Sequence, residues 1–182
     1  MLAKLKSRLA SSCRRLVGRE DGAAALEFAL VAAPFIALML AVLQTVLAFF
    51  AGQVLESAVA DASREILTGQ AQTSNMTQQG FAQAVCNKVQ TLFSCAGLMV
   101  DVQTAASFSA ANTGQPTLTY DGSGNVTNAW QYNPGTPGDI VVVRVMYLWP
   151  VVVGPLSLNL SSQQGNKLLL MSTAVFKNEP YQ

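Results

Sequence analysis

The spacing of apolar residues changes along this chain in a way that separates it into segments. Residues 28–52 form a nearly continuous apolar run without a charge. As a helix that rises about 1.5 Å per residue, this run is longer than the roughly 30 Å hydrocarbon core of a bilayer. Residues 23–52 are therefore predicted to be a transmembrane helix, between a leader of residues 1–22 and a domain of residues 53–182. The alternative, a cleaved secretory signal, would have a shorter apolar core followed by small residues.

The helical pattern continues beyond the apolar run, now with charged residues between the apolar ones. Apolar positions recur every fourth residue at Val54, Ala58, Ala62 and Ile66, beside Leu55 and Val59. This period predicts that the same helix packs one side against a soluble domain. Gly69 is the expected stop, so the whole helix should cover about 45 residues. A second helix is expected to start near Ser74 or Asn75 as N-cap. Its expected buried positions are Phe81, Val85, Val89 and Leu92.

Beyond Ala96 the apolar period becomes two, which is typical of half-buried strands. The first strand should point Leu98, Val100 and Val102 inward and Met99, Asp101 and Gln103 outward, with Phe108 as an extension. Residues 109–138 should form loops, with a small exposed hairpin or loop at 121–125, and further strands are expected at 140–148 and 168–176. Local connections favour antiparallel pairing. The predicted fold class is α+β: a long N-terminal transmembrane helix that continues into a soluble domain, a second helix, and an antiparallel sheet of three to four strands.

Charge is distributed unevenly about the apolar run. Residues 1–22 carry six basic and two acidic residues, a net charge of +4, whereas the remainder carries a net charge of −3. A basic segment before a transmembrane helix predicts a cytoplasmic N-terminus and a translocated C-terminal domain. A nucleic-acid-binding arm, the alternative for the basic segment, would need a basic soluble body. No nucleic-acid partner is therefore expected.

The cysteines fall on both sides of the predicted membrane span. Cys13 lies in the basic leader, whereas Cys86 and Cys95 lie in the translocated part, where an oxidising compartment permits a disulfide. A loop of about ten residues would be stabilised by roughly 2.5–3 kcal/mol in the chain-entropy model. Zinc binding is the alternative, but the chain has no histidine and no CxxC pair. We therefore expect a Cys86–Cys95 disulfide and no metal site.

Glu27 is the only charge between Asp21 and Glu56. A carboxylate at membrane depth costs roughly 2.5–3.5 kcal/mol on insertion scales, so a compensating partner is expected, an amine above all.

Residues 19–28 resemble the processing site of type IV pilin-like proteins. A short basic leader ends at Gly22, small residues follow, Glu27 is the fifth residue after it and the aromatic Phe28 the sixth. The resemblance implies that a membrane prepilin peptidase cuts after Gly22, and that Glu27 neutralises the new amine of Ala23 within the chain or in a neighbouring subunit. In an uncut chain the partner of Glu27 would be Arg19 or its own proton.

A wider set of segments resembles the TadE-like pseudopilin family of the tight-adherence (Flp) pilus system. These segments are residues 22–34, Ala62-Ser63-Arg64, Gly138-Asp139-Ile140-Val141 and Lys177-Asn178-Glu179-Pro180-Tyr181. The resemblance implies a minor pilin-like protein of the bacterial inner membrane, with a periplasmic domain, that acts in a hetero-oligomer with other pilin-like subunits and the secretion machinery. It implies a need for this protein in pilus assembly, with or without its entry into the filament. Because Glu20 and Asp21 stand directly before Gly22, an unprocessed anchor that acts as a periplasmic scaffold is the alternative.

Two further features of the transmembrane helix bear on assembly. Pro34 is expected to kink the helix, because it lacks an N–H and its ring clashes with the preceding turn. Small residues recur at a spacing of four: Ala25, Ala29, Ala33, Ala37 and Ala41. Such a stripe lets helices approach closely in lipid, although alanine is also simply common here.

The usual signatures of catalysis are missing from the sequence. Without histidine the common serine, cysteine and zinc sites cannot form, and no phosphate-binding glycine motif is present. Asp101, Asp121 and Asp139 could be imagined as hydrolase carboxylates or calcium ligands, but a strand surface, a turn and a strand start are the simpler roles expected for them. Trp130, Tyr132, Tyr147 and Trp149 could form a partner face, although the edge of the core is the favoured role. We therefore expect no enzyme activity and no cofactor, and a membrane-tethered carboxylate hydrolase is the alternative from another class.

Overall fold

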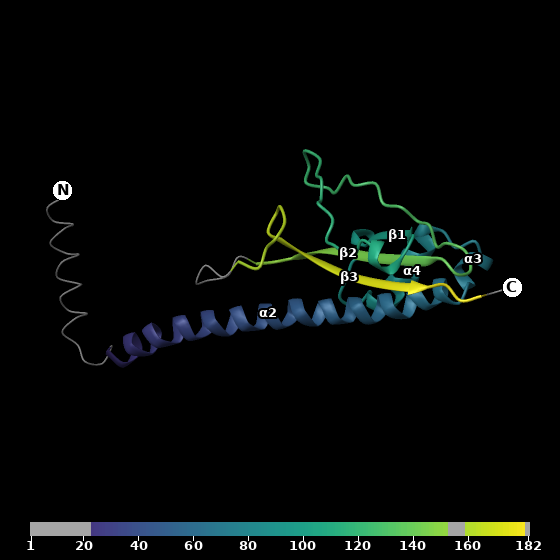
Figure 1. Ribbon diagram of the computed structural model, residues 1–182. Helices are drawn as coiled ribbons and strands as arrows, with labels where there is room; N and C mark the ends of the chain where they lie inside the picture. Colours follow the sequence, from purple (N-terminus) through teal and green to yellow (C-terminus); the bar gives the residue numbers. More distant parts are fainter. Residues whose placement is uncertain (1–22, 153–158, 181–182) are drawn as a thin grey trace. The chain divides into compact units, whose positions relative to one another are not determined.

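The structure is a computed structural model that describes residues 23–152 and 159–180 (Figure 1). Its helices are α2 (Ala23–Leu67), α3 (Gln70–Thr73) and α4 (Gln78–Val89), with 3₁₀ turns η2 (Cys95–Gly97) and η3 (Phe108–Ala110). Its strands are β1 (Met99–Ala105), β2 (Ile140–Pro150) and β3 (Lys167–Lys177). This element order confirms the predicted α+β class.

The chain divides into two compact units, with the boundary between Leu43 and Gln44 inside α2. The first unit contains the N-terminal part of α2. The second unit, called the folded domain below, contains residues 44–152 and 159–180 of the described chain.

The sheet of the folded domain is antiparallel, with strand order β1-β2-β3. In its register Val100 lies opposite Val145, and Val143 lies opposite Ala174. The central strand β2 is buried without interruption from Val141 to Met146. Such burial needs cover on both faces, and the sheet has it. One face packs on α2 and α4, and on the other face Met146 and Leu169 of the sheet form a smaller cluster with Leu118.

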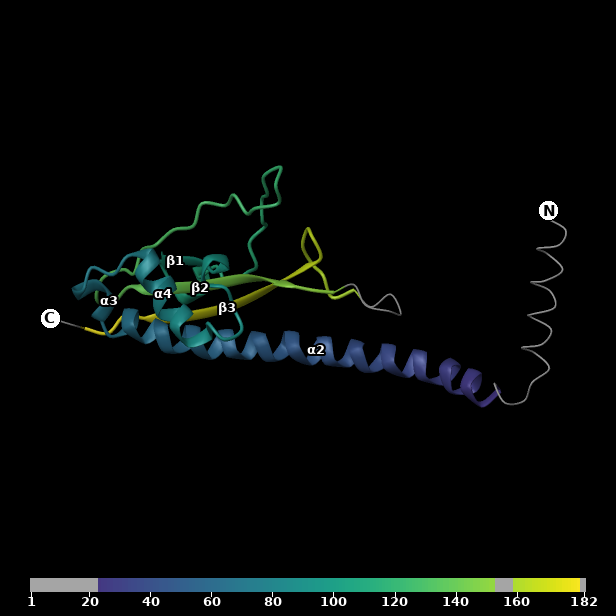
Figure 2. The ribbon, with the colours of Figure 1, turned by 180° about the vertical axis from the view of Figure 1, so that it is seen from behind.

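The C-terminal part of α2 lies against the sheet through the side that the four-residue period predicted. Figures 1 and 2 show α4 and the sheet along this part of the helix. Its fully or nearly fully buried side chains are Leu55, Ala58, Val59, Ala62 and Ile66. The helix ends at Leu67, two residues before Gly69, whose φ of 79° few other residues adopt readily. The prediction of one helix of about 45 residues is confirmed.

The start of the second helix was predicted too early. Ser74 ends the short helix α3, where its hydroxyl donates to the Gln70 carbonyl at 2.7 Å. Asn75 then turns the chain with a φ of 51°, and Thr77 is the N-cap of α4, since its Oγ1 accepts from the Gly80 N–H at 3.1 Å. Phe81, Val85 and Val89 are buried as predicted, whereas Leu92 is half-buried beyond the end of the helix.

Two predictions about the first strand and the following loop have different outcomes. The strand β1 ends at Ala105, and Phe108 lies in η3 with 58% of its surface exposed, so its predicted role as a strand extension was wrong. The hairpin near residue 121 is present. Tyr120 pairs with Val126, and the Asp121 carboxylate accepts the Asn125 N–H at 2.8 Å across the turn.

Candidate functional site

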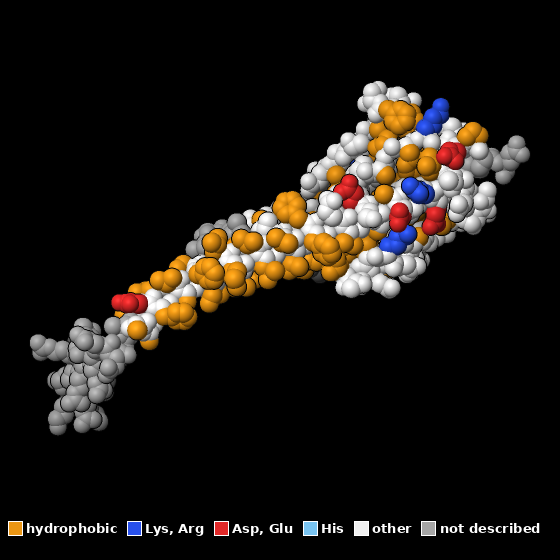
Figure 3. Space-filling model, turned by 90° about the horizontal axis from the view of Figure 1, so that it is seen from below, with side chains coloured by type: hydrophobic (Ala, Val, Ile, Leu, Met, Phe, Trp, Pro, Cys, Tyr) orange, Lys and Arg blue, Asp and Glu red, His pale blue; other side chains and the backbone are white. Residues whose placement is uncertain are grey.

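The N-terminal part of α2 is the strongest candidate for a functional site, because its apolar surface is not covered by the described chain. Figure 3 shows hydrophobic side chains along the visible side of this helix. Fifteen large apolar side chains between residues 26 and 50 are 46–74% exposed: Leu26, Phe28, Leu30, Val31, Phe35, Ile36, Leu38, Met39, Leu40, Val42, Leu43, Val46, Leu47, Phe49 and Phe50. A helix that is apolar all round belongs in a protein core or in a membrane. Since 6% of its most apolar 18-residue window is buried, this helix fits a single-pass membrane protein.

Glu27 lies within this apolar surface, on the second turn of α2. It is four residues after Ala23, a rise of about 6 Å along the helix axis. Among the residues that the structure describes, none donates a hydrogen bond to the Glu27 carboxylate or forms an ion pair with it. Phe28, the next residue, is 74% exposed. Gly22 and the leader with Arg19 lie outside the described residues, so the predicted processing site is described only on its C-terminal side.

Pro34 and the alanine stripe, the other two features predicted to bear on assembly, both lie in α2. Pro34 lies inside α2, which continues as a helix on both sides of it. Of the alanine stripe, Ala25, Ala29 and Ala33 are exposed, Ala37 is half-buried and Ala41 is buried. The kink at Pro34 and the pairing of helices through the stripe therefore stay predictions.

The predicted disulfide between Cys86 and Cys95 is present. It joins α4 to η2, directly before β1. The Cys86 side chain is fully buried and Cys95 is exposed, so the bond links the buried side of α4 to the surface turn before β1.

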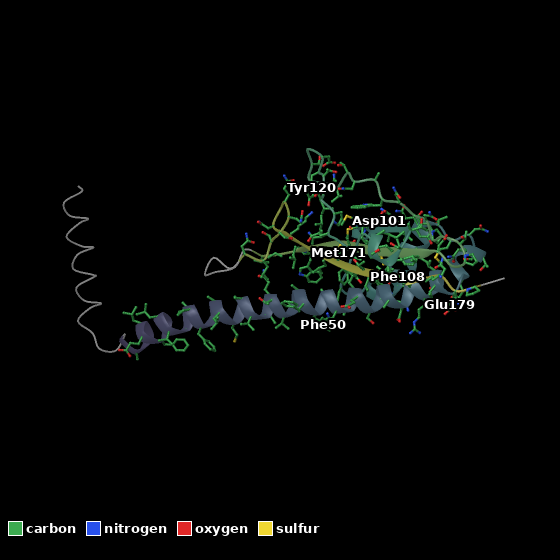
Figure 4. The ribbon with its side chains drawn as sticks, viewed as in Figure 1. Phe50, Asp101, Phe108, Tyr120, Met171 and Glu179 are labelled. Carbon is green, nitrogen blue, oxygen red and sulfur yellow. A yellow bond between two sulfur atoms is a disulfide. The ribbon has the colours of Figure 1, made fainter. Side chains whose placement is uncertain are left out.

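The surface role predicted for Asp101 was wrong. Asp101 is 1% exposed, and Arg144 lies directly opposite it on β2 and is 6% exposed. Figure 4 shows Asp101 in the folded domain. The Arg144 Nε donates to Asp101 Oδ2 at 3.1 Å, and an Arg144 terminal nitrogen donates to the same oxygen. The Gln131 N–H donates to Asp101 Oδ1 at 2.9 Å, and the Gln103 amide also donates to the carboxylate. Asp101 therefore joins β1 and β2 to the connecting segment of residues 106–139, which contains Gln131, through charge-assisted bonds.

A signal for this pair was present in the sequence. Arg144 interrupts a run of valines in the strand predicted at 140–148, and an arginine that is buried among valines needs an acid close by. Its partner could have been sought among the acids on neighbouring strands.

The predicted turn and strand-start roles of the other two acids are confirmed. Asp139 precedes β2, and its Oδ2 accepts from the Thr136 N–H at 2.8 Å and the Thr136 hydroxyl at 2.9 Å. These bonds hold the pKa of Asp139 below its usual value. Hydrogen bonds to the Asn125 side chain and backbone likewise lower the pKa of Asp121. Across residues 23–152 and 159–180, no three histidine, cysteine or acidic side chains gather into a possible metal site.

Two of the C-terminal segments that carried the family resemblance meet in the folded domain. The Asn178 N–H donates to the Asp139 carbonyl at 2.8 Å, and the Gly138 N–H donates to the Asn178 carbonyl at 3.1 Å. The Asn178 amide also donates to the Pro134 carbonyl at 2.8 Å. The following Glu179 N–H donates to the Leu67 carbonyl at the end of α2 at 2.9 Å (Figure 4). These residues therefore fasten the chain after β3 to the helix end and to the start of β2.

The four aromatic residues considered as a partner face pack at the edge of the core, as favoured from the sequence. Tyr147 and Trp149 contact the Phe93 ring edge-on, with centroids 4.8 and 5.6 Å away. Tyr132 lies against Phe81, and Trp130 packs on the cluster around Leu118. A partner face built from these rings has no support in this packing.

Comparison with known proteins identifies one part of the chain. Residues 22–64 match the family described as TadE-like protein, so the chain is TadE-like over this segment. The matched residues cover the exposed apolar part of α2, Glu27 and most of the helix that enters the folded domain. No curated protein and no solved structure gives a match.

Proposed function

From the TadE-like character of residues 22–64, we propose that this chain is a minor pilin-like membrane protein required for assembly of a tight-adherence pilus. One observation carries the proposal: the TadE-like segment coincides with a helix whose apolar surface the rest of the described chain leaves exposed. A helix with such a surface acts by contact, with lipid and with other helices, and an assembly role uses contact alone.

In this proposal residues 23–52 cross the bacterial inner membrane, with the leader in the cytoplasm and the folded domain in the periplasm. The excess of basic residues in the leader supports this orientation. The Cys86–Cys95 disulfide supports an oxidising compartment for the domain. The partners are other pilin-like subunits and the secretion machinery, joined as a hetero-oligomer.

Glu27 has the central role at the membrane. An acid on an apolar helix surface is stable there only if a positive group or a proton compensates it. Cleavage after Gly22 would create an amine on Ala23, about one helical turn from Glu27. That amine, from the same chain or from a neighbouring subunit, is the partner we assign to Glu27.

We assign no catalytic role to the folded domain. The three acids considered for hydrolysis already have structural partners: Arg144 for Asp101, Asn125 for Asp121 and Thr136 for Asp139. A carboxylate that is neutralised by an arginine inside the fold is a poor general acid or base.

The role in assembly is tested by deleting the gene in its native cell and counting surface pili by electron microscopy. We expect pili to be lost, and to return with the wild-type gene or with Gln70→Ala, a matched change at an exposed position of the folded domain. Normal piliation in the deletion strain would overturn the proposal.

Processing is tested separately by the intact mass of the protein extracted from membranes. A chain that begins at Ala23 supports cleavage by the prepilin peptidase. A chain that begins at Met1 or Leu2 would instead support the unprocessed anchor, which scaffolds the machinery and does not need the Ala23 amine.

A further inference from the structure

The folded domain has an apolar groove beside the point where α2 enters it. Residues of α2 form one wall: Thr45, Ala48, Phe49, Gly52 and Gln53. Leu160 forms the other wall together with Leu168 and Leu170 of β3. The groove has a volume of about 330 Å³ and is lined almost entirely by hydrocarbon. A water-exposed groove of this composition would be unfavourable in a soluble domain.

The surface beside the groove is apolar on one side and charged on the other. Phe49 in its wall and Phe50 beside it are 71% and 55% exposed. Figure 4 shows Phe50 on α2. On the other side, Glu56 accepts a hydrogen bond from the amide of the groove residue Gln53 at 3.2 Å. The sequence has no charge between Arg144 and Lys167, which spans the end of β2 and the start of β3. Exposed aromatic side chains between an apolar surface and a charged one are typical of a membrane interface.

Helix length places the groove at the membrane boundary, if α2 spans the bilayer as in the proposed function. A hydrocarbon core of about 30 Å takes about 20 residues of helix. Counted from Phe28, directly after Glu27, these residues end near Leu47. The groove residues of α2 therefore begin in the last turn within the hydrocarbon and end in the headgroup region.

We propose that this groove binds the hydrocarbon tail of a membrane lipid, so that the folded domain contacts the bilayer through a second surface besides the spanning helix. No partner chain is needed to fill the groove, because lipid surrounds α2 at this depth. A lipid tail is thin, apolar and present in excess at this depth.

The first test measures contact between groove and lipid in vesicles of phosphatidylglycerol and phosphatidylethanolamine. A fluorescent label is placed at Leu160→Cys in the full chain with Cys13→Ser, and the vesicles contain lipid with a nitroxide on its acyl chain. Matched labels are placed at Phe35→Cys in the spanning part of α2 and at Gln70→Cys, an exposed position beyond its C-terminal end. We expect quenching at residue 160 to be close to that at residue 35 and several times that at residue 70.

The controls separate this inference from the function on which it rests. Quenching at residue 35 without quenching at residue 160 would overturn the lipid groove and leave the spanning helix intact. Absence of quenching at both would overturn the membrane placement as well. Quenching at residue 160 that disappears when pilin-like subunits are co-expressed would mean that a partner side chain fills the groove, which also overturns the inference.

A second test fills the groove from inside. Gly52 lines it, and a Cβ added there would meet no atom within 4 Å, so Gly52→Ala should not disturb folding and serves as the control for a larger side chain. Native mass spectrometry of the detergent-purified full chain should detect retained phospholipid in the wild type and in Gly52→Ala, and several-fold less in Gly52→Leu. Equal retention in all the proteins would contradict a lipid site here.

Discussion

Two acids in this chain lie in apolar stretches, and their surroundings differ. Asp101 is buried inside the folded domain, where Arg144, Gln103 and the Gln131 backbone donate to its carboxylate. Glu27 lies on the exposed apolar part of α2, and no partner for it is present among the described residues. The domain thus satisfies its own buried acid, whereas the helix presents an acid for which we propose compensation by a processed N-terminus or by another subunit.

This contrast separates folding from assembly. The large apolar residues of α2 beyond Gln53 are buried or half-buried by the domain, so substitutions there should act on stability. The large apolar residues before Phe50 are exposed, so substitutions there should act on insertion and partner binding. The following predictions test whether the two parts can be disturbed independently.

The largest effect on the domain should come from Arg144→Met. It leaves Asp101 buried without its cation, and breaking a buried ion pair on one side destabilises by about 3–5 kcal/mol. The free energy of unfolding of the full chain in detergent, measured with urea, should fall by this amount while membrane insertion is unchanged. The double variant Asp101→Leu/Arg144→Met should recover most of the loss, because no buried charge is left. A decrease within about 0.5 kcal/mol for Arg144→Met, the range of ordinary surface changes, would contradict the assigned role.

A smaller effect is expected from Cys95→Ala. Loss of the cross-link frees a loop of about ten residues in the unfolded chain, which corresponds to roughly 2.5–3 kcal/mol in the chain-entropy model. Urea unfolding of the oxidised protein should show this decrease, and the matched variant Cys13→Ser, in the leader, should not. If Cys95→Ala and wild type unfolded alike under oxidising conditions, the disulfide would not stabilise the domain.

The effect of alkaline pH should be smaller and confined to the domain. Burial, together with the carboxylate of Glu65, raises the pKa of Tyr132 to about 12, from an ordinary value of 10.0. Above pH 10 the unfolded chain loses this proton while the folded chain keeps it. The unfolded state then binds fewer protons, so the free energy of unfolding should decrease as pH rises from 10 toward 12.

The matched variant for this pH dependence is Tyr132→Phe. The Tyr132 hydroxyl has no hydrogen-bond partner in the described part of the chain, so its removal should change stability little at neutral pH. Urea unfolding at several pH values should show a shallower alkaline decrease in Tyr132→Phe than in wild type. Identical slopes would mean that Tyr132 does not titrate as assigned.

Local periodicity was sufficient to predict much of this fold. The four-residue period gave the length of α2 and its buried side, and the period of two located the strands. The burial of Asp101 was missed because alternation along one strand carries no information about Arg144, which lies 43 residues away in the sequence. The start of α4 was missed because Ser74, Asn75 and Thr77 all suit an N-cap. Contacts outside the segment, such as the Gln78 amide donating to the Val100 carbonyl, favour the observed start.

In the candidate site, too, features set by local sequence could be predicted, whereas those that depend on distant segments could not. The apolar helix and the disulfide could be predicted from residue type and spacing alone. The groove beside Gly52 could not, because its second wall comes from Leu160, Leu168 and Leu170, more than a hundred residues later in the chain. A surface of this kind depends on tertiary packing, which no local pattern reports.

The central claim is that the acid of the apolar helix acts in assembly, and Glu27→Ala tests it most directly. Membranes from cells that express wild type, Glu27→Ala or the neighbouring control Leu26→Ala are solubilised, and the pilin-like subunits that co-purify with each are quantified. We expect all three proteins to be inserted in equal amounts, and the partners to be lost from Glu27→Ala alone. Undiminished recovery of the partners with Glu27→Ala would contradict the account.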